Sequence, residues 1–302
     1  MTLPVLLALL AVQLLFASLA ITAKFVLPVV PATALVLIRL LGGTIAFGLA
    51  ARLAGDTPIA RDDRWRMALL GVIGIAANQV GFLVGLKYTT AIHATILVAT
   101  IPVLTAVVAI LAGRERFARD KAIGIGLAVA GTLWLIGPDR LHLDARAAFG
   151  NLVIELGMLA YAGYLVWSRD LVRRYGSLRT VAWFFLAATI AVLPVSLPAV
   201  IRAPWEAVPL AVWGWIAWIV IGPTIATYYL NLYALRRTSA TVVAGFIYLQ
   251  PVVTAIVAPL VLEGEAVTPR AVGAGMAILL GLVVVLRAEA VEARALRPVP
   301  VA

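Results

Sequence analysis

Cysteine is absent from this 302-residue chain, and only two histidines occur, His93 and His142. The first absence excludes disulfide bonds, thiolate nucleophiles and cysteine-ligated metals. With two separated histidines and no cysteine, no metal site is expected. A phosphate-binding loop of the form GxxxxGK[ST] is also missing, so the chain cannot use ATP directly. No cofactor is expected.

Charge is scarce as well. Charged residues make up 13% of the chain and hydrophobic residues 64%, with a mean hydropathy of +1.07. This composition lies far outside the range of soluble domains. Apolar runs of about 20 residues, enough to cross roughly 30 Å of hydrocarbon, follow one another along the sequence. We therefore predict an all-α polytopic membrane protein that spans the lipid bilayer with ten transmembrane helices. The predicted spans are residues 3–23, 33–51, 66–86, 90–111, 121–137, 148–168, 180–201, 208–232, 239–261 and 271–287.

The distribution of Lys and Arg predicts how these spans are oriented. If the N-terminus is cytoplasmic, 17 of the 24 basic residues lie in cytoplasmic loops and the tail, and only six lie on the other side. Cytoplasmic loops carry such an excess of positive charge, so both termini are predicted to be cytoplasmic. The net charge of +10 then reflects topology, and no nucleic-acid partner is expected. The first span lacks a basic start, and we interpret it as a retained helix rather than a signal peptide.

Part of the sequence occurs twice. Residues 85–91 (GLKYTTA) reappear with conservative changes as residues 234–240 (ALRRTSA), 149 residues later. At an offset of 145 residues, 44–46 (TIA) in the second span match 189–191 (TIA) in the seventh. The chain is therefore predicted to be internally duplicated.

The duplication divides the chain into a first five-helix repeat, residues 1–140, a second repeat, residues 146–288, and a cytoplasmic tail, residues 289–302. Five spans is an odd number, so the second repeat must enter the membrane upside down relative to the first. Two inverted repeats of this kind are typical of secondary transporters, with the substrate site at the repeat interface.

Several short motifs occur along the chain, some in both repeats and some in only one of them. They are Arg39 in the second span, Tyr88-Thr89-Thr90-Ala91 at the start of the fourth, Pro102 and Pro251 within the fourth and ninth, and Glu115 and Glu265 before the glycine-rich fifth and tenth spans. In the order and spacing of these motifs the chain resembles the drug/metabolite transporter superfamily, namely ten-span carriers built from two EamA-type repeats. The resemblance covers residues 5–287. It implies a bacterial-type inner-membrane exporter of metabolites or amino acids, with spans 1–4 and 6–9 around a central cavity.

Pro102 and Pro251 correspond to each other at the offset of 149 residues. A proline within a helix removes one backbone hydrogen bond and kinks the helix. In a membrane, the carbonyl groups that lose their partners need protein donors or a water-filled cavity. We predict a pair of bent helices that line the site and move during transport. The alternative is a static kink that neighbouring helices satisfy.

Polar and aromatic side chains recur on several spans. In the eighth span Thr224, Thr227, Tyr228 and Asn231 share one helical face. Because burying an unpaired polar group costs about 2–7 kcal/mol, this face is not expected to meet lipid. The residues predicted to line a cavity for a small-molecule substrate are Gln13, Phe16, Asn78, Gln79, Phe82, Thr100, Thr224, Thr227, Tyr228, Asn231, Tyr248 and Gln250. The alternative is that these groups form hydrogen bonds between helices and hold the bundle together.

Two charged residues lie inside predicted spans. Arg39 is roughly 9 Å from the outer end of the second span and Glu155 is roughly 10 Å from the outer end of the sixth, at 1.5 Å per residue. An unpaired charge in the bilayer costs at least about 2.5–3.5 kcal/mol, so equal depth and opposite sign favour a salt bridge with a structural or gating role. The competing interpretation is that Glu155 carries a coupling proton, as intramembrane acids commonly do. A firm ion pair would hold Glu155 in its charged form, so the two roles are in tension.

These features predict a secondary transporter that exports small metabolites, amino acids with aromatic or other bulky side chains among them, by alternating access. An enzyme is not expected, because an intramembrane enzyme would need a cluster of acids or histidines that the sequence does not offer. A membrane sensor or scaffold stays open as an alternative, as do drug export, nucleoside export and uptake. Gly81 and Gly85 form a small-xxx-small motif, a weak indication of dimerisation, so a monomer or weak homodimer is expected.

Overall fold

The computed structural model describes residues 3–54, 59–113, 119–136, 145–235, 237 and 246–295, and these residues form helices and turns without any strand. The first half contains α1 (Leu3–Val26), α2 (Ala32–Leu53), α3 (Arg61–Leu70), η1 (Gly71–Ala77), α4 (Asn78–Leu86), α5 (Ala91–Val98), α6 (Ile101–Leu111) and α7 (Arg119–Ile136). The second half contains α8 (Ala145–Tyr175), α9 (Ser177–Arg202), η3 (Trp205–Ala207), α10 (Leu210–Val220), η4 (Ile221–Ala226), α11 (Thr227–Leu235), η5 (Phe246–Tyr248), α13 (Leu249–Val261) and α14 (Pro269–Ala295).

Most of these helices, alone or joined end to end, suit a membrane. Seven stretches are long and apolar enough to cross one: Leu3–Val26, Ala32–Leu53, Arg61–Leu86, Ala91–Leu111, Ala145–Ser168, Leu178–Arg202 and Leu210–Asn231. Three shorter apolar helices, Ala122–Leu135, Leu249–Val261 and Pro269–Gly281, fall within the fifth, ninth and tenth predicted spans. The prediction of an all-helical membrane protein is confirmed for the described residues.

Two helices extend beyond the spans read from hydropathy. α8 continues to Tyr175, and α14 continues to Ala295, so the predicted tail begins as helix. Residues 288–295 (AEAVEARA) are rich in Ala and Glu, which favour helix. Hydropathy marks where apolar residues end, whereas a helix continues as long as its residues support it.

In the described part of the chain, four spans contain irregular helical geometry, in two corresponding pairs. The third and eighth predicted spans each contain a short π-helical turn, η1 and η4, which begin 150 residues apart at Gly71 and Ile221. The fourth span is broken between α5 and α6, and Pro102 occupies the first turn of α6. Pro251 lies in the first turn of α13. This helix directly follows η5, a 3₁₀ helix of one turn. The helical geometry thus changes just before each proline, and the predicted bending and movement at these prolines stay a prediction. π-turns are often found at functional sites.

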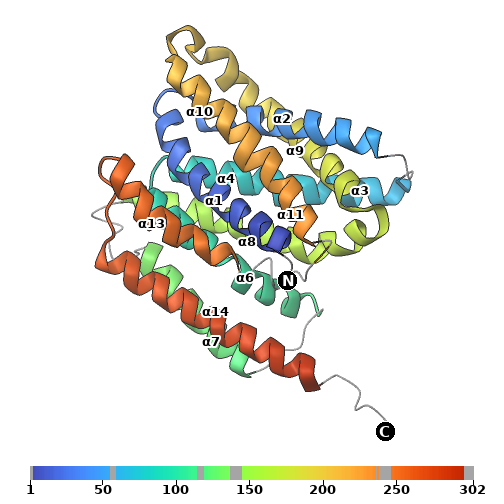
Figure 1. The fold of residues 1–302 in the computed structure, drawn as a ribbon, viewed down its shortest axis with the longest axis vertical. Coiled ribbons are helices and arrows are strands. Elements are labelled where there is room, and N and C mark those ends of the chain that lie inside the picture. Colours follow the sequence, from blue (N-terminus) through green and yellow to red (C-terminus); the bar gives the residue numbers. More distant parts are fainter. Residues whose placement is uncertain are drawn as a thin grey trace.

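The two halves pack against each other by pairing corresponding helices (Figure 1). α2 packs on its counterpart α9, and α7 packs on its counterpart α14. Other contacts between the halves also correspond. The contact of α4 with α8 is the counterpart of that of α11 with α1, and the contact of α6 with α8 is the counterpart of that of α13 with α1. At the α2–α9 contact, Thr44 Oγ1 and Thr189 Oγ1 are 2.8 Å apart. These two threonines belong to the TIA segments that match at an offset of 145 residues.

Glycines bring α7 and α14 into close backbone contact. A β-carbon at Gly131 would lie 2.9 Å from the Ala274 carbonyl oxygen, and one at Gly281 would lie 2.4 Å from the Gly124 carbonyl oxygen. These are the same contact in the two halves, because each residue is 150 positions from its counterpart. As residue numbers rise along α7, those of the contacting residues fall along α14. The two helices therefore run antiparallel.

The α4–α8 and α1–α11 contacts also correspond. Gly85 lies against Gly150 and Ile154, where a β-carbon would meet the Gly150 carbonyl oxygen at 2.5 Å. In the other half, the buried Ala234 packs in a small cluster with Val5 and Leu9. These three residues occupy the positions that match Gly85, Gly150 and Ile154 at the two offsets already noted. The packing thus repeats residue by residue.

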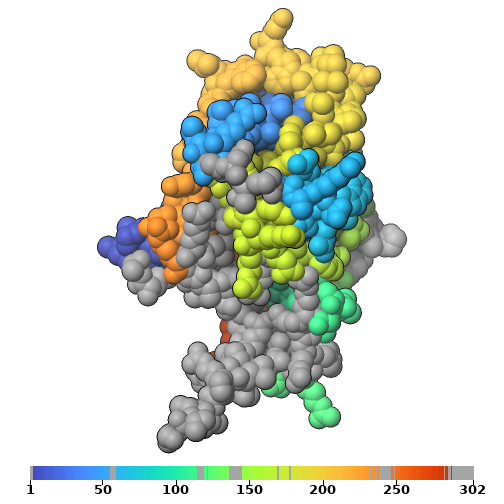
Figure 2. Space-filling view, turned by 90° about the vertical axis from the view of Figure 1, so that its right-hand side faces the viewer, coloured from blue at the N-terminus to red at the C-terminus, as the bar shows by residue number. Residues whose placement is uncertain are grey.

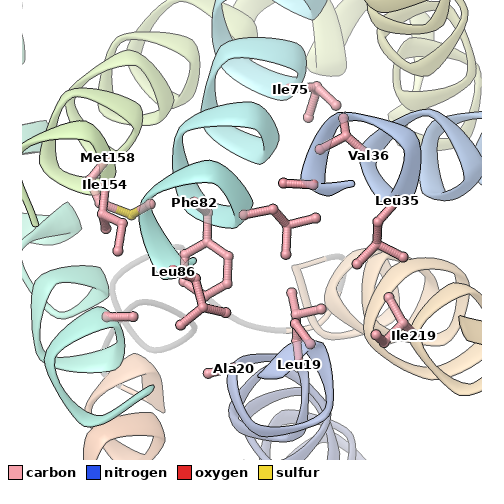
Figure 3. Close-up of a cluster of buried hydrophobic side chains, with 14 of the residues drawn as sticks. Leu19, Ala20, Leu35, Val36, Ile75, Phe82, Leu86, Ile154, Met158 and Ile219 are labelled. Carbon is pink, nitrogen blue, oxygen red and sulfur yellow. The ribbon is translucent and has the colours of Figure 1, made fainter. Parts of the chain in front are cut away.

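The apolar core joins the two halves near the end of α1 (Figure 3). Leu19 and Ala20 of α1 face Phe82 and Leu86 of α4, with Ile219 of α10 beside them. These side chains are at most 7% exposed, so this region is tightly closed. Large apolar residues such as Leu14, Ile45 and Ile190 are instead exposed on the flanks, as a lipid-facing surface requires.

The ends of several helices meet on the face shown in Figure 2. The end of α2, all of α3 and the end of α8 lie on it together. Asp63 of α3 is 4% exposed and accepts hydrogen bonds from Tyr175 Oη at 2.5 Å and Arg174 Nη1 at 2.8 Å. These contacts fasten the first half to the end of α8.

Candidate functional site

Arg39 lies at the interface of the two halves. Its side chain is 3% exposed, and Nε donates to Thr224 Oγ1 of η4 at 3.0 Å. The Thr224 hydroxyl donates in turn to the Ile219 carbonyl oxygen at 2.9 Å, which fixes its orientation. Tyr228 lies one helical turn from Thr224 and is close enough to Arg39 to interact with it electrostatically. A cation is thus held between α2 and η4.

The predicted salt bridge between Arg39 and Glu155 is absent from the described residues. α4 packs against both α2, which carries Arg39, and α8, which carries Glu155. Glu155 is half-buried and faces Thr100, whose hydroxyl is 3.1 and 3.2 Å from the two carboxylate oxygens. Equal depth along two helices does not make their side chains neighbours, and the pairing prediction failed for that reason.

Thr100 connects Glu155 to the break in the fourth span. Its hydroxyl is also 2.7 Å from the Leu97 carbonyl oxygen, next to the residues where α5 ends. A hydroxyl has one proton, so it donates either to Leu97 or to the carboxylate at a given moment. The state of the Glu155 carboxyl group is therefore linked to the backbone just before Pro102.

A second polar contact joins α1 and α13, the counterpart of the α8–α6 pair. Gln250 Nε2 donates to Gln13 Oε1 at 2.6 Å, and both side chains are at most 4% exposed. Each half thus contributes its first helix to a polar contact with the proline-bearing span of the other half. One contact uses neutral amides and the other uses an ionisable carboxyl group.

Aromatic side chains surround this region, and the sequence analysis singled out only one of them. The Tyr228 ring packs edge-on against Phe185 at 4.9 Å and Phe47 at 6.1 Å between ring centroids. Tyr161 and Tyr164 of α8 stack at 5.3 Å. Tyr161 of α8 and Tyr228 of α11 are both only partly buried. Tyr161 and Tyr228 are close enough to interact electrostatically, and their positions in the sequence did not indicate this.

Other predicted cavity residues have structural partners. Asn78 Nδ2 donates to the Gly157 carbonyl oxygen at 3.2 Å, and Thr227 Oγ1 donates to the Gly222 carbonyl oxygen at 3.0 Å. Phe82 packs in the apolar cluster near Leu86 (Figure 3). Phe16 and Asn231 are half-buried. Tyr248 belongs to η5, and its side chain lies outside the described residues.

Gln79 of α4 is the most unusual member of the predicted set. Its side chain is 3% exposed, yet neither Nε2 nor Oε1 has a hydrogen-bond partner among the described residues. Leaving a buried polar group unsatisfied costs about 1–3 kcal/mol. Gln79 and Tyr228 occupy corresponding positions in the two halves, 149 residues apart.

A further set of contacts closes one end of the bundle. The Glu265 carboxylate accepts hydrogen bonds from the backbone N–H groups of Ala91 at 2.5 Å and Ile92 at 3.3 Å, at the start of α5. Beside it, Lys24 Nζ donates to the Thr89 carbonyl oxygen, and Thr89 Oγ1 donates to Asn151 Oδ1 at 2.5 Å. A carboxylate at a helix N-terminus satisfies free N–H groups and interacts favourably with the helix dipole.

An open pocket in the described part of the chain does not coincide with the predicted site. A pocket of about 260 Å³ lies at the ends of α1 and α9, where Lys87 and Arg202 border it. None of the twelve predicted cavity residues lines it. Within the described part of the chain, no three His, Asp or Glu side chains are grouped closely enough to hold a metal ion.

Known proteins resemble this chain in sequence and fold. A family model described as the EamA-like transporter family matches residues 3–137 and 148–287, which are the two predicted repeats with small differences at their ends. A solved crystal structure of a protein aligns with 93% of this chain and 96% of its own at a TM-score of 0.63 and 21% identity. At that identity the likeness concerns the fold alone.

Three curated relatives carry transporter names. "Uncharacterized transporter YyaM" of Bacillus subtilis (strain 168) is 27% identical over 63% of each chain. An "uncharacterized transporter" of Archaeoglobus fulgidus is 28% identical over 64% of this chain and 65% of its own. A "probable terminal-alkyne amino-acid exporter" of Streptantibioticus cattleyicolor is 26% identical over 82% of each chain. The match to the first two relatives thus spans a little less than two thirds of their length.

Proposed function

Because the chain belongs to the EamA-like transporter family, we propose that it is a secondary transporter that exports small metabolites across the membrane. The observation that carries the proposal is the match of this family to both halves of the chain, residues 3–137 and 148–287. Membership of a transporter family favours transport over catalysis. The apolar helices make the chain an integral membrane protein, and we propose the bacterial inner membrane with both termini in the cytoplasm.

The proposed architecture is ten spans in two inverted repeats. Support comes from the antiparallel packing of α7 and α14, which end the two family matches. Helices that correspond in sequence yet run in opposite directions fit repeats related by a twofold axis in the membrane plane. The Thr44–Thr189 contact supports the same axis, because a residue lying on such an axis touches its own counterpart.

Substrate would pass between α1 and α4 of the first repeat and α8 and α11 of the second. We propose that Gln13, Phe16, Asn78, Gln79, Phe82, Thr100, Thr224, Thr227, Tyr228, Asn231, Tyr248 and Gln250 border this path at some stage of the transport cycle. Gln79 supports this role, because its buried amide has no partner among the described residues. The breaks before Pro102 and Pro251 and the π-turns η1 and η4 would serve as hinges.

Glu155 is the candidate carrier of a coupling proton. Without an ion pair to Arg39, its carboxyl group can bind and release a proton, and Thr100 would transmit the change to the break in the fourth span. Replacing Glu155 by Gln removes the titration and keeps the shape of the side chain. Export by Glu155→Gln should lose its dependence on pH, and a pH profile identical to the wild type would exclude the carrier role.

Amino acids are the first substrate class to test. The relative in Streptantibioticus cattleyicolor is named as a probable exporter of a terminal-alkyne amino acid, and it is similar over 82% of each chain. Aromatic rings around Tyr228 would suit bulky side chains.

The test is counterflow in proteoliposomes. Purified protein is reconstituted with unlabelled amino acids, nucleosides or cationic drugs inside, and uptake of each labelled compound is measured against protein-free liposomes. Exchange of at least one metabolite is expected. Failure of every compound to exchange, with protein that is folded and inserted, would contradict the proposal.

A further inference from the structure

We propose that Arg39 binds the carboxylate of the transported metabolite. This inference rests on the transport function proposed above and identifies the part of the substrate that the protein recognises. Its basis is a guanidinium group that is buried between the two halves and has no carboxylate beside it in the part of the chain that the structure describes. The substrate class is therefore metabolites with a free acid group, amino acids included.

The Arg39 guanidinium is held in place by one hydrogen bond, and most of its N–H donors have no acceptor among the described residues. Its single hydrogen bond among the described residues runs from Nε to Thr224 Oγ1 at 3.0 Å. Within the described ranges neither Nη nitrogen makes a hydrogen bond, so four of the five N–H donors remain available. Thr224 is itself held by the Ile219 carbonyl oxygen, which fixes the plane of the contact. A guanidinium held at Nε presents its Nη groups as a fork that fits a carboxylate with two parallel hydrogen bonds.

Among the described residues, no carboxylate contacts the Arg39 guanidinium. Glu155 is the acid that lies well inside a predicted span, and among the described residues its hydrogen-bond partner is Thr100. A buried charge without a partner is strongly disfavoured, and a bound anion would neutralise it. A ligand with a positive charge and no acid group would be repelled from the same position. The sign of Arg39 thus selects acids over cationic drugs.

The position also fits a transport cycle. Arg39 comes from α2 of the first half and Thr224 from η4 of the second, so both halves contribute to the proposed binding site. Tyr228 lies on the same face of the eighth span, with Phe47 and Phe185 around its ring. A hydroxyl donor and aromatic surfaces therefore adjoin the cation. When the halves move relative to each other, the donors around the carboxylate change together.

The test compares acids with their neutral amides. Phenylalanine, leucine and lactate are each paired with the corresponding amide, which differs only in the carboxylate. Inhibition of counterflow and thermal stabilisation in detergent, followed by tryptophan fluorescence, are measured for the wild type, Arg39→Gln, Arg39→Lys and the control Arg202→Gln. Arg202 is an exposed cation at the end of α9 and is not among the residues predicted to line the cavity.

The wild type and Arg202→Gln should prefer at least one acid to its amide by about 10- to 100-fold, the range expected for a hydrogen bond to a charged group. Arg39→Gln should lose this preference while binding the amides as the wild type does. Arg39→Lys keeps the charge without the fork and should retain a weaker preference.

Three results would overturn the inference. One is an acid preference that survives in Arg39→Gln. Another is an Arg39→Gln protein that weakens acids and amides equally, because Arg39 would then act only in folding. The third is a wild type that exchanges metabolites without preferring any acid, in which case the carrier function stands and the role of Arg39 fails. If no compound exchanges at all, the carrier function itself fails.

Discussion

Gly281 offers a sharp test of how the two halves meet. A β-carbon at this position would lie 2.4 Å from the Gly124 carbonyl oxygen and 2.7 Å from the Ala128 backbone nitrogen. Ordinary contacts of a β-carbon begin near 3.4 Å, so Gly281→Ala forces α7 and α14 apart by about 1 Å. The contact atoms are backbone and cannot rotate away. Overpacking of this kind costs about 1–3 kcal/mol.

A matched control exists in the same pair of helices. Gly126 of α7 has no atom within 4 Å of the position that a β-carbon would occupy. Because Ala favours helix over Gly by about 1 kcal/mol, Gly126→Ala should be neutral or stabilising. The two substitutions are chemically identical, so opposite effects isolate the contact between the helices.

The assay is thermal unfolding in detergent, followed by the fluorescence of the eight tryptophans. With about 2–4 °C for each kcal/mol, Gly281→Ala should lower the melting temperature by several degrees and Gly126→Ala should not. If Gly281→Ala melts at or above the wild-type temperature, α7 and α14 do not approach as described and the symmetric contact is wrong.

Three further experiments each test an individual contact. In a double-mutant cycle with Thr44→Val and Thr189→Val, the unfolding free energies should show a coupling of about 0.6 kcal/mol, and zero coupling would remove the hydrogen bond across the proposed axis. Glu265→Ala removes the acceptor at the start of α5 and should cost about 0.5–2 kcal/mol in thermal unfolding, and an unchanged melting curve would refute that contact. Asp63→Asn should lower the free energy of unfolding by about 1–3 kcal/mol, because the buried Asp63 carboxylate accepts hydrogen bonds from Tyr175 and Arg174. The same change at the exposed Asp62 should have no effect, and equal effects of the two substitutions would refute the role of Asp63.

Much of the architecture was predictable because it depends on local composition and on repetition. Apolar runs near 20 residues identified the membrane-spanning helices, and the matching TIA segments indicated the duplication, although no contact between Thr44 and Thr189 was predicted from them. Proline in the fourth span correctly marked a break in the helix, since a missing N–H acts on its own turn.

What escaped prediction depends on how helices are arranged in space. Depth along two spans made Arg39 and Glu155 look like partners, but depth gives no information on which helices are neighbours. The approach of Tyr161 to Tyr228 and the contact of Glu265 with α5 join residues far apart in sequence. π-turns leave no clear sequence pattern, although Gly71 and Gly222 with Pro223 were a local sign of irregular helix.

The central claim, an inverted pair of repeats, is tested most directly by accessibility labelling. The chain contains no cysteine, so single cysteines at Lys87 and at Arg237 can be labelled without background. Both residues are exposed, and they lie in the corresponding turns of the two halves. A membrane-impermeant maleimide applied to intact cells should label the cysteine at Lys87 and leave the one at Arg237 unlabelled until the membrane is opened. Labelling of both cysteines from the same side would contradict the inverted arrangement.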